Sequence, residues 1–209
     1  MTIGEAYFSF LSKTGLLDTP ELAPETYRIE YFFNEAIKLL INQMLPIADS
    51  TDEGRNFFKY LVTPDTINIL SSEKFPNSVG VDNSLFNSDY LKILHEDCTL
   101  AIEDITITGI PVKPIRYDEY NINKLNPFKS PFIDLTVNEG LVWRLMYDNK
   151  CILITPPNCN ITEYNIVYIK PHKHFSLSVL DDSIDIGELF HERLVDVAIE
   201  IAFGKVIKK

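Results

Sequence analysis

The sequence of 209 residues contains no run of 18 consecutive apolar residues, and its first residues do not pair a basic segment with an apolar one. A transmembrane helix needs about 20 predominantly apolar residues, and a secretory signal needs a basic segment followed by an apolar one. We therefore expect neither an export signal nor a membrane span, and a soluble protein with no membrane partner.

Cysteine is scarce, with only Cys98, Cys151 and Cys159 in the chain. An odd number of cysteines makes no complete disulfide framework and is typical of a reducing compartment. His172 and His174 would point the same way on a strand and could share a metal with Cys151 or Cys159, but a solvent-facing turn is the commoner outcome of such a pair. We expect three free, buried thiols and no metal.

Positive charge is also limited, because the chain has 19 Lys and Arg against 30 Asp and Glu, which gives a formal net charge of −11. A protein that binds nucleic acid through its phosphates needs clustered Lys and Arg. The charge therefore argues against a protein that binds nucleic acid through its phosphates. The content of hydrophobic residues, 45%, is ordinary for a folded globular chain.

The motifs of several common enzyme sites are absent. The sequence contains neither G-x-x-x-x-G-K-[ST] nor G-x-G-x-x-G, and no G-x-S-x-G. The pairs Asp118-Glu119 and Asp181-Asp182 are typical of a helix start and a solvated turn, and a Ser/His/Asp set assembled in space stays open. We predict no enzyme, no catalytic residue and no cofactor.

Helical patterns occur at both ends of the chain. Thr2 and Glu5 have the spacing of a capping box, and Gly15 follows as a stop signal. The predicted helices span residues 2–13, 24–45, 49–60 and 186–205. The second and the last carry apolar arcs wider than one packing partner requires.

Between these helices the hydrophobic period changes to two, which is typical of strands. The predicted strands span residues 66–70, 90–95, 99–108, 112–117, 141–147, 151–155 and 164–170. Asp148-Asn149 would form the turn of the clearest hairpin. We predict an α+β protein, with a helical domain formed by both chain ends (1–62 and 184–209), an inserted antiparallel β-domain (85–178) and a linker (63–84).

The last helix raises two interpretations. His191-Glu192 begins like the H-E-x-x-H motif of zinc hydrolases, but Val195 stands where the second histidine belongs, so one ligand remains. The second apolar face of the helix could be covered by the β-domain or by a neighbouring subunit. The residues that we assign to a hypothetical subunit interface are Val195, Ile199, Ala202, Val206 and His191.

Several stretches resemble a known family when they are taken in order. They are MTIGEAYFSFLSKTG, FNEAIKLLI, DEYNINKLNPFKSP, VWRLMYD, EYNIVYIKPHKHFSL and the last helix, HERLVDVAIEIA. Together they resemble phage head-to-tail adaptor proteins, such as tail tubular protein A of short-tailed phages and the ring proteins of crAss-like phages.

The resemblance implies a non-enzymatic virion protein of the neck or tail, present in the host cytoplasm during assembly. It implies a homo-oligomeric ring, usually a dodecamer, that extends the DNA channel below the portal protein and docks further neck and tail proteins. Double-stranded DNA would pass without specific binding. In such a ring the end of the chain could dock on the portal or a neighbouring ring, through Lys205, Ile207, Lys208 and Lys209.

Two alternatives remain open. One is an intracellular ligand-binding module or enzyme with an aromatic-lined site in the β-domain, formed by Tyr117, Tyr120, Trp143, Tyr147, Tyr164 and Tyr168. The other is a tail hub or fibre-attachment protein, which would share the fold and differ in its neighbours.

Overall fold

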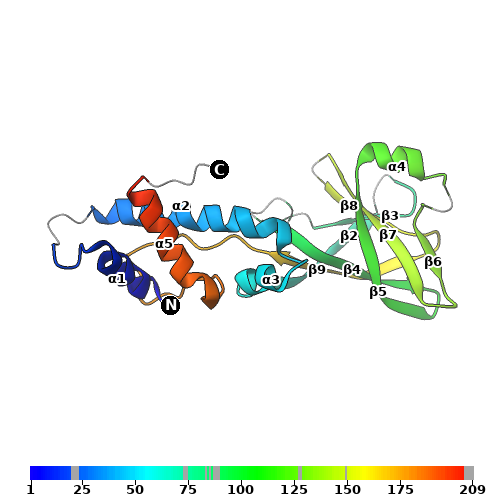
Figure 1. The fold of residues 1–209 in the computed structure, drawn as a ribbon. Helices are drawn as coiled ribbons and strands as arrows, with labels where there is room; N and C mark the ends of the chain where they lie inside the picture. Colours follow the sequence, from blue (N-terminus) through cyan, green and yellow to red (C-terminus); the bar gives the residue numbers. More distant parts are fainter. Residues whose placement is uncertain are drawn as a thin grey trace. The chain divides into compact units, whose positions relative to one another are not determined.

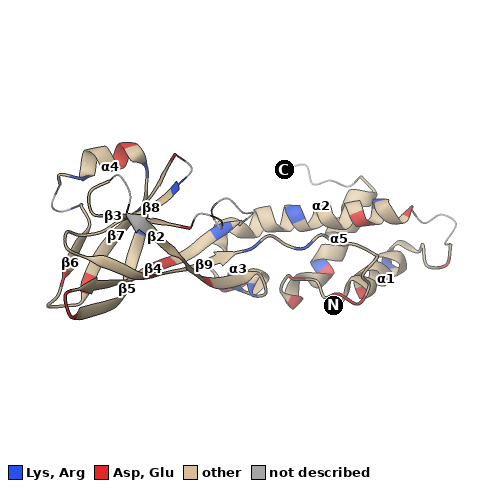
Figure 2. Cartoon of the chain, turned by 180° about the vertical axis from the view of Figure 1, so that it is seen from behind, with Lys and Arg blue, Asp and Glu red and all other residues tan. Residues whose placement is uncertain are grey.

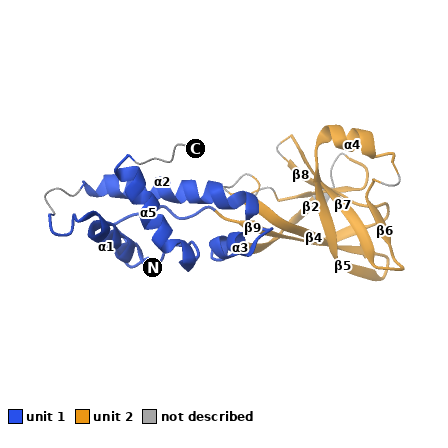
Figure 3. Ribbon diagram, in the orientation of Figure 1, with its two compact units in different colours: residues 1–62, 171–209 blue, residues 63–170 orange. Residues whose placement is uncertain are grey.

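The computed structural model describes residues 1–19, 24–72, 75–82, 84, 86, 90–126, 129–148 and 150–204, with only the backbone of 71–72. The chain divides into two compact units (Figure 3). Residues 1–62 and 171–209 belong to the first, which we call the helical unit, and residues 63–170 to the second, the β-unit. Helices and a curled mixed sheet together make an α+β protein (Figure 1).

The first helix, α1 (Ile3–Thr14), has the capping box that its sequence predicts. The Thr2 hydroxyl oxygen accepts from the Glu5 amide at 3.1 Å, and the Glu5 carboxylate accepts from the Thr2 amide at 2.8 Å. Gly15 ends the helix with φ 73°, a left-handed conformation that glycine adopts without steric cost. The local signals at both ends of α1 are therefore sufficient to define it.

The remaining helices of the helical unit are α2 (Thr26–Met44), η2 (Leu45–Ile47), α3 (Asp52–Phe58), η3 (Glu188–Phe190) and α5 (His191–Ala202). The predicted last helix began too early, because Gly187 is extended, with φ −58° and ψ 141°. Its amide donates to the Phe57 carbonyl at 2.9 Å, and a Cβ at this position would lie 2.1 Å from the Asn56 carbonyl oxygen. This tight contact interrupts the helical pattern before η3.

The core of the helical unit is rich in phenylalanine. Phe33 on α2 stacks on Phe175, with ring centroids 4.3 Å apart, and its ring is tilted against that of Phe10 on α1, at 5.8 Å. Phe57 contacts Phe190 edge to face at 4.9 Å. Aromatic pairs of this kind contribute about 0.5–1.5 kcal/mol beyond their buried area. They join segments from both ends of the chain in one core.

The described residues of the β-unit form one sheet and one short helix. Its strands are β1 (Val62–Ile67), β2 (Ile69–Ser72), β3 (Ser78–Val81), β4 (Lys92–Ile102), β5 (Ile105–Ile115), β6 (Phe132–Asp134), β7 (Glu139–Tyr147), β8 (Lys150–Ile154) and β9 (Asn160–Ile169). The strand order is β1-β9-β4-β5-β7-β8-β3-β2, and β6 pairs with β7. The helix is α4 (Tyr117–Asn123).

Three predictions about the β-unit are wrong. The stretch 63–84 is not a linker, because it supplies β1, β2 and β3 to the sheet. The sheet is mixed, not antiparallel, since β5 and β7 pair in parallel. The predicted strand 99–108 is broken by a turn at Glu103, whose φ of 51° allows β4 and β5 to form an antiparallel pair.

The sheet has an apolar core on each face of β7. Val142 belongs to a large inner core with residues such as Leu100, Ile110 and Tyr164. Trp143 and Leu145 belong to a smaller outer core with Tyr120 of α4. Because successive strand residues point to opposite faces, the uninterrupted apolar run in β7 reflects burial on both sides. α4 and its surroundings thus create a second layer where a functional site can form.

Candidate functional site

The C-terminal helix α5 packs mainly on α2 and also on α1. Leu194, Val195 and Ala198 are fully buried within this unit, and His191 is only 8% exposed. The assignment of Val195 and His191 to a surface available for a neighbouring subunit is therefore wrong. These side chains are already covered almost completely by their own chain and leave little surface for docking.

His191 has a structural role at the start of α5. Its Nε2 donates to the Ile186 carbonyl oxygen at 3.0 Å, which leaves Nδ1 as an acceptor for the Met1 amine at 3.3 Å. Burial and the nearby amine lower the pKa of His191. Glu192 is exposed beside it. The ring nitrogens are thus occupied by backbone groups.

The outer edge of α5 remains accessible. Ile199 and Ala202 are partly exposed, and Phe203, directly after the helix, is 58% exposed. Ile199 and Phe203 are four residues apart, the spacing at which helical side chains neighbour each other. The remaining interface and docking residues, Val206, Lys205, Ile207, Lys208 and Lys209, lie outside the described residues.

The three thiols, of which Cys151 and Cys159 were weighed as possible metal ligands, are free and buried. Burial raises the pKa of Cys98 and Cys151 to about 12, and it also raises the pKa of Cys159. A thiolate is the form that binds metal, so these protonated thiols are poor ligands at neutral pH. Within the described residues, no group of three or more His, Cys, Asp or Glu is placed to hold a metal ion.

The Nε2 of His172 and the Oδ2 of Asp185 are buried without a hydrogen-bond partner among the described residues. Burial lowers the pKa of His172. His174 is exposed. The two histidines therefore differ in their surroundings, and neither belongs to a described group that could hold a metal ion.

Four of the six aromatic residues proposed for a ligand site come together on the outer face of the sheet. Tyr120 lies edge-on to Trp143 at 6.3 Å, and Tyr117 stacks on Tyr147 at 5.1 Å. Phe75, which the sequence analysis did not single out, contacts Tyr117, Tyr120 and Tyr147. The structure thus forms an aromatic cluster around α4.

The other two tyrosines lie elsewhere. Tyr164 is fully buried in the inner core, where its hydroxyl donates to Glu96 Oε2 at 2.6 Å. Tyr168 is partly buried and packs against the same core. Burial and the carboxylate of Glu96 raise the pKa of Tyr164. These two rings stabilise the fold and line no shared site with Tyr120.

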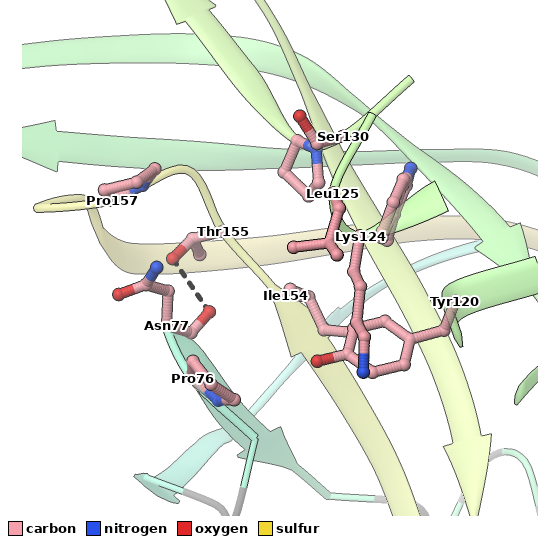
Figure 4. Close-up of a pocket in the computed structure, with 11 residues that line it drawn as sticks. Pro76, Asn77, Tyr120, Lys124, Leu125, Ser130, Ile154, Thr155 and Pro157 are labelled. Atoms are coloured by element: carbon pink, nitrogen blue, oxygen red, sulfur yellow. Dashed lines mark hydrogen bonds between the residues drawn. The ribbon is translucent and has the colours of Figure 1, made fainter. Parts of the chain in front are cut away.

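A pocket of about 280 Å³ lies beside the aromatic cluster (Figure 4). Its apolar wall consists of Tyr120, Trp143, Leu125, Ile154, Pro76, Pro131 and Pro157. Its polar wall consists of Asn77, Lys124, Ser130 and Thr155. The sequence analysis missed all of these except Tyr120 and Trp143, because their loops meet only in the folded sheet.

The pocket is held in shape by local contacts. The amide and the hydroxyl of Thr155 both donate to the Asn77 carbonyl oxygen, at 2.8 and 3.1 Å, and the hydroxyl bond is drawn in Figure 4. The Lys124 ammonium lies 5.5 Å from the centre of the Tyr120 ring and donates to Asn121 Oδ1 at 3.3 Å. Among the described residues, Lys124 is the only charged one in the lining. The pocket therefore combines an apolar wall with one positive charge.

No protein-family model matches the chain, and no curated protein is significantly similar to it. None of the helices in the described ranges is both long and apolar enough to cross a bilayer.

Proposed function

We propose that this chain is a structural subunit of an oligomeric ring in the head-to-tail connector of a phage particle. Both ends of the chain would build the ring-forming helical domain, with the β-unit as an insertion. The ring, a dodecamer in the proposal, would extend the DNA channel below the portal and dock further tail proteins. The proposal rests on the resemblance of the sequence to adaptor proteins and on the surface of the helical unit.

The observation that carries the proposal is the apolar surface left exposed on that unit. The large apolar and aromatic side chains that are at least 40% exposed there are Phe8, Leu17, Tyr27, Tyr31, Leu39, Tyr60, Val179, Leu180, Leu189 and Phe203. Single exposed apolar residues are normal, and the described residues of the β-unit expose as many, so these side chains support a protein interface without assigning it to one unit alone. A closed ring needs two different complementary faces on each subunit, so exposure on several helices supports this assembly.

The net negative charge of the chain supports a ring through which DNA passes without being bound. Acidic and basic residues are distributed over both units in Figure 2, and the acidic ones outnumber the basic ones. A protein that neutralises few phosphates binds DNA weakly, which allows DNA to slide past. A chain with a net charge of −11 meets this requirement.

The mass of the assembled protein tests the proposal directly. Native mass spectrometry and negative-stain electron microscopy of the purified full chain should show closed rings, alone or with the portal protein of the same phage. Antibodies against the chain should label the neck of intact particles. A strictly monomeric protein that is absent from particles would overturn the proposal.

The pocket beside Tyr120 and Trp143 favours a second candidate, an intracellular ligand-binding module. A ligand-binding module would bind a soluble ligand as a monomer, whereas the assembly of a ring subunit would not depend on a ligand. The same mass measurement separates the two functions.

A further inference from the structure

The pocket beside α4 is a partly open cavity of the β-unit, and its apolar surroundings extend beyond it. Leu125 on its rim is 87% exposed, and Ile122 on α4 is 75% exposed. Side chains this apolar and this exposed lose contact with water when another molecule covers them, at roughly 25 cal/mol per Å². Whatever fills the pocket can therefore gain further free energy by covering α4.

The size of the pocket limits what can enter. About 280 Å³ is just below the range of roughly 300–1,000 Å³ found for small-molecule sites. A single large side chain is a better match for this volume than a complete cofactor. A free small molecule would also leave Ile122 and most of Leu125 in water, whereas a polypeptide would cover both.

Part of the wall of the pocket is held in place before anything binds. Pro76, Pro131 and Pro157 each have a fixed φ, which reduces the backbone freedom that they can lose on binding. Trp143 and Tyr120 are 2% and 8% exposed, so their rings are already held in place by the outer core. A preformed pocket of this kind is typical of the centre of a protein interface, where one anchor residue inserts.

The positive charge of the pocket lining favours an acidic residue next to the anchor residue that inserts. Lys124 contributes a positive charge, and no acidic residue is among the described lining residues, although the whole chain carries −11. The side-chain amide of Asn77 and the hydroxyl of Ser130 belong to the same polar wall. All three groups can donate to a carboxylate at the mouth of the pocket.

We propose that this pocket binds an anchor side chain of a partner protein, an aromatic or leucine-sized residue next to an acidic one. The anchor would pack against Trp143, Tyr120 and Ile154, and its acidic neighbour would pair with Lys124. The inference rests on the proposed function only in placing the partner in the same assembly. It assigns to the β-unit the docking of that partner.

A titration of the purified full chain with short peptides tests the inference. Trp143 is the only tryptophan, so one emission band and one indole N–H resonance report on the pocket. The probe is N-acetyl-Phe-Glu-amide, with N-acetyl-Ala-Glu-amide lacking the anchor and N-acetyl-Phe-Gln-amide lacking the charge. We expect saturable changes with the Phe peptides only. The Gln peptide should bind about 2- to 5-fold more weakly, as an exposed ion pair allows.

Two variants connect the binding to named residues. Leu125→Ser should weaken both Phe peptides, and Lys124→Gln should remove the preference for Glu over Gln. Lys173→Gln, an exposed residue of the helical unit and outside the lining, is the matched control and should change neither. Circular dichroism of each variant verifies that the fold is kept, which the exposure of these side chains leads us to expect.

Three results would overturn the inference. One is binding that neither pocket variant alters. Another is phenylacetate binding as tightly as the dipeptide, which would indicate a free small ligand. The third is a Trp143 signal that changes with protein concentration alone, which would show that a second copy of the chain fills the pocket. Ring mass, measured on the same variants, should stay unchanged, so a failed pocket and a failed ring are distinguished.

Discussion

Arg144 and Glu96 form two hydrogen bonds inside the β-unit, with Nε to Oε2 at 2.7 Å and Nη2 to Oε1 at 2.9 Å. The two side chains, on β7 and β4, are 9% and 8% exposed, and the Tyr164 hydroxyl completes the network at Glu96. The Arg144 guanidinium also lies 4.9 Å from the centre of the Phe86 ring. The two buried charges are therefore paired with each other.

Removing one member of this pair should be costly. We predict that Arg144→Leu destabilises the protein by about 3–5 kcal/mol, because Glu96 would stay buried without its partner. A variant with Glu96→Leu, Arg144→Leu and Tyr164→Phe should recover most of that loss, since no unpaired polar group remains. Urea unfolding followed by circular dichroism measures both. A single variant as stable as the wild type would contradict the prediction.

Two apolar positions on α5 should respond differently to the same substitution. Val195→Asp places a charge in a fully buried site and should unfold or aggregate the protein. Ile199→Asp changes a partly exposed side chain and should leave a folded subunit that no longer forms rings. Size-exclusion chromatography with light scattering, together with thermal unfolding, checks this contrast. Normal ring formation by Ile199→Asp would show that the exposed edge of α5 is not part of the subunit interface.

The three cysteines should react slowly in the native protein. At pH 8, a thiol with a pKa of about 12 is ionised in on the order of one molecule in 10⁴, and Cys98 and Cys151 are also fully buried. We expect Ellman's reagent to label these two over hours in buffer and all three cysteines within minutes in denaturant. Cys159, 9% exposed, should be the first to react. Rapid labelling of Cys98 in buffer would show that the inner core opens.

Acidification should weaken the helical unit. The pKa values of His191 and His172 are lowered by burial, so the unfolded chain binds these protons more readily than the folded one. Their contribution to stability is complete above the unfolded pKa of roughly 6.5 and is lost as the pH falls below it toward the folded pKa. The thermal midpoint should therefore be lower at pH 5.5 than at pH 8.

His191→Gln provides the test of that pH dependence, because it should reduce the difference in midpoint between the two pH values. Glu188 does not titrate in this window, since hydrogen bonds from Lys59 and Tyr60 lower its pKa to about 2. Its contribution is present above the unfolded pKa and is lost only as the pH falls toward 2. An unchanged difference in His191→Gln would exclude His191 as a source.

Gly187 should be sensitive to the smallest possible substitution. In Gly187→Ala the new Cβ would lie 2.1 Å from the Asn56 carbonyl oxygen, which forces η3 and α3 apart. We expect a loss of about 1–3 kcal/mol, the usual cost of overpacking. Gly109→Asn is the matched control, because nothing lies within 4 Å of a Cβ there and asparagine tolerates its φ of 73°. Chemical unfolding of both variants measures the contrast.

The sequence alone was sufficient where short-range physics decides the structure. The ends of α1 follow from Thr2, Glu5 and Gly15, and Asp148 adopts the positive φ of 53° that its hairpin turn requires. The α+β class follows from the change of hydrophobic period along the chain. Each of these signals acts within a few residues and does not depend on the rest of the fold.

Tertiary structure decided everything that depends on which surfaces meet. Apolar periodicity identified the faces of α5 but not what covers them, so Val195 and His191 were assigned to an interface although their own unit buries them. The parallel pairing of β5 with β7 and the network of Glu96 with Arg144 join residues distant in sequence. The pocket beside Trp143 likewise exists only because loops from several strands meet over one face of the sheet. Side-chain type is local, whereas burial and proximity are properties of the whole packed chain.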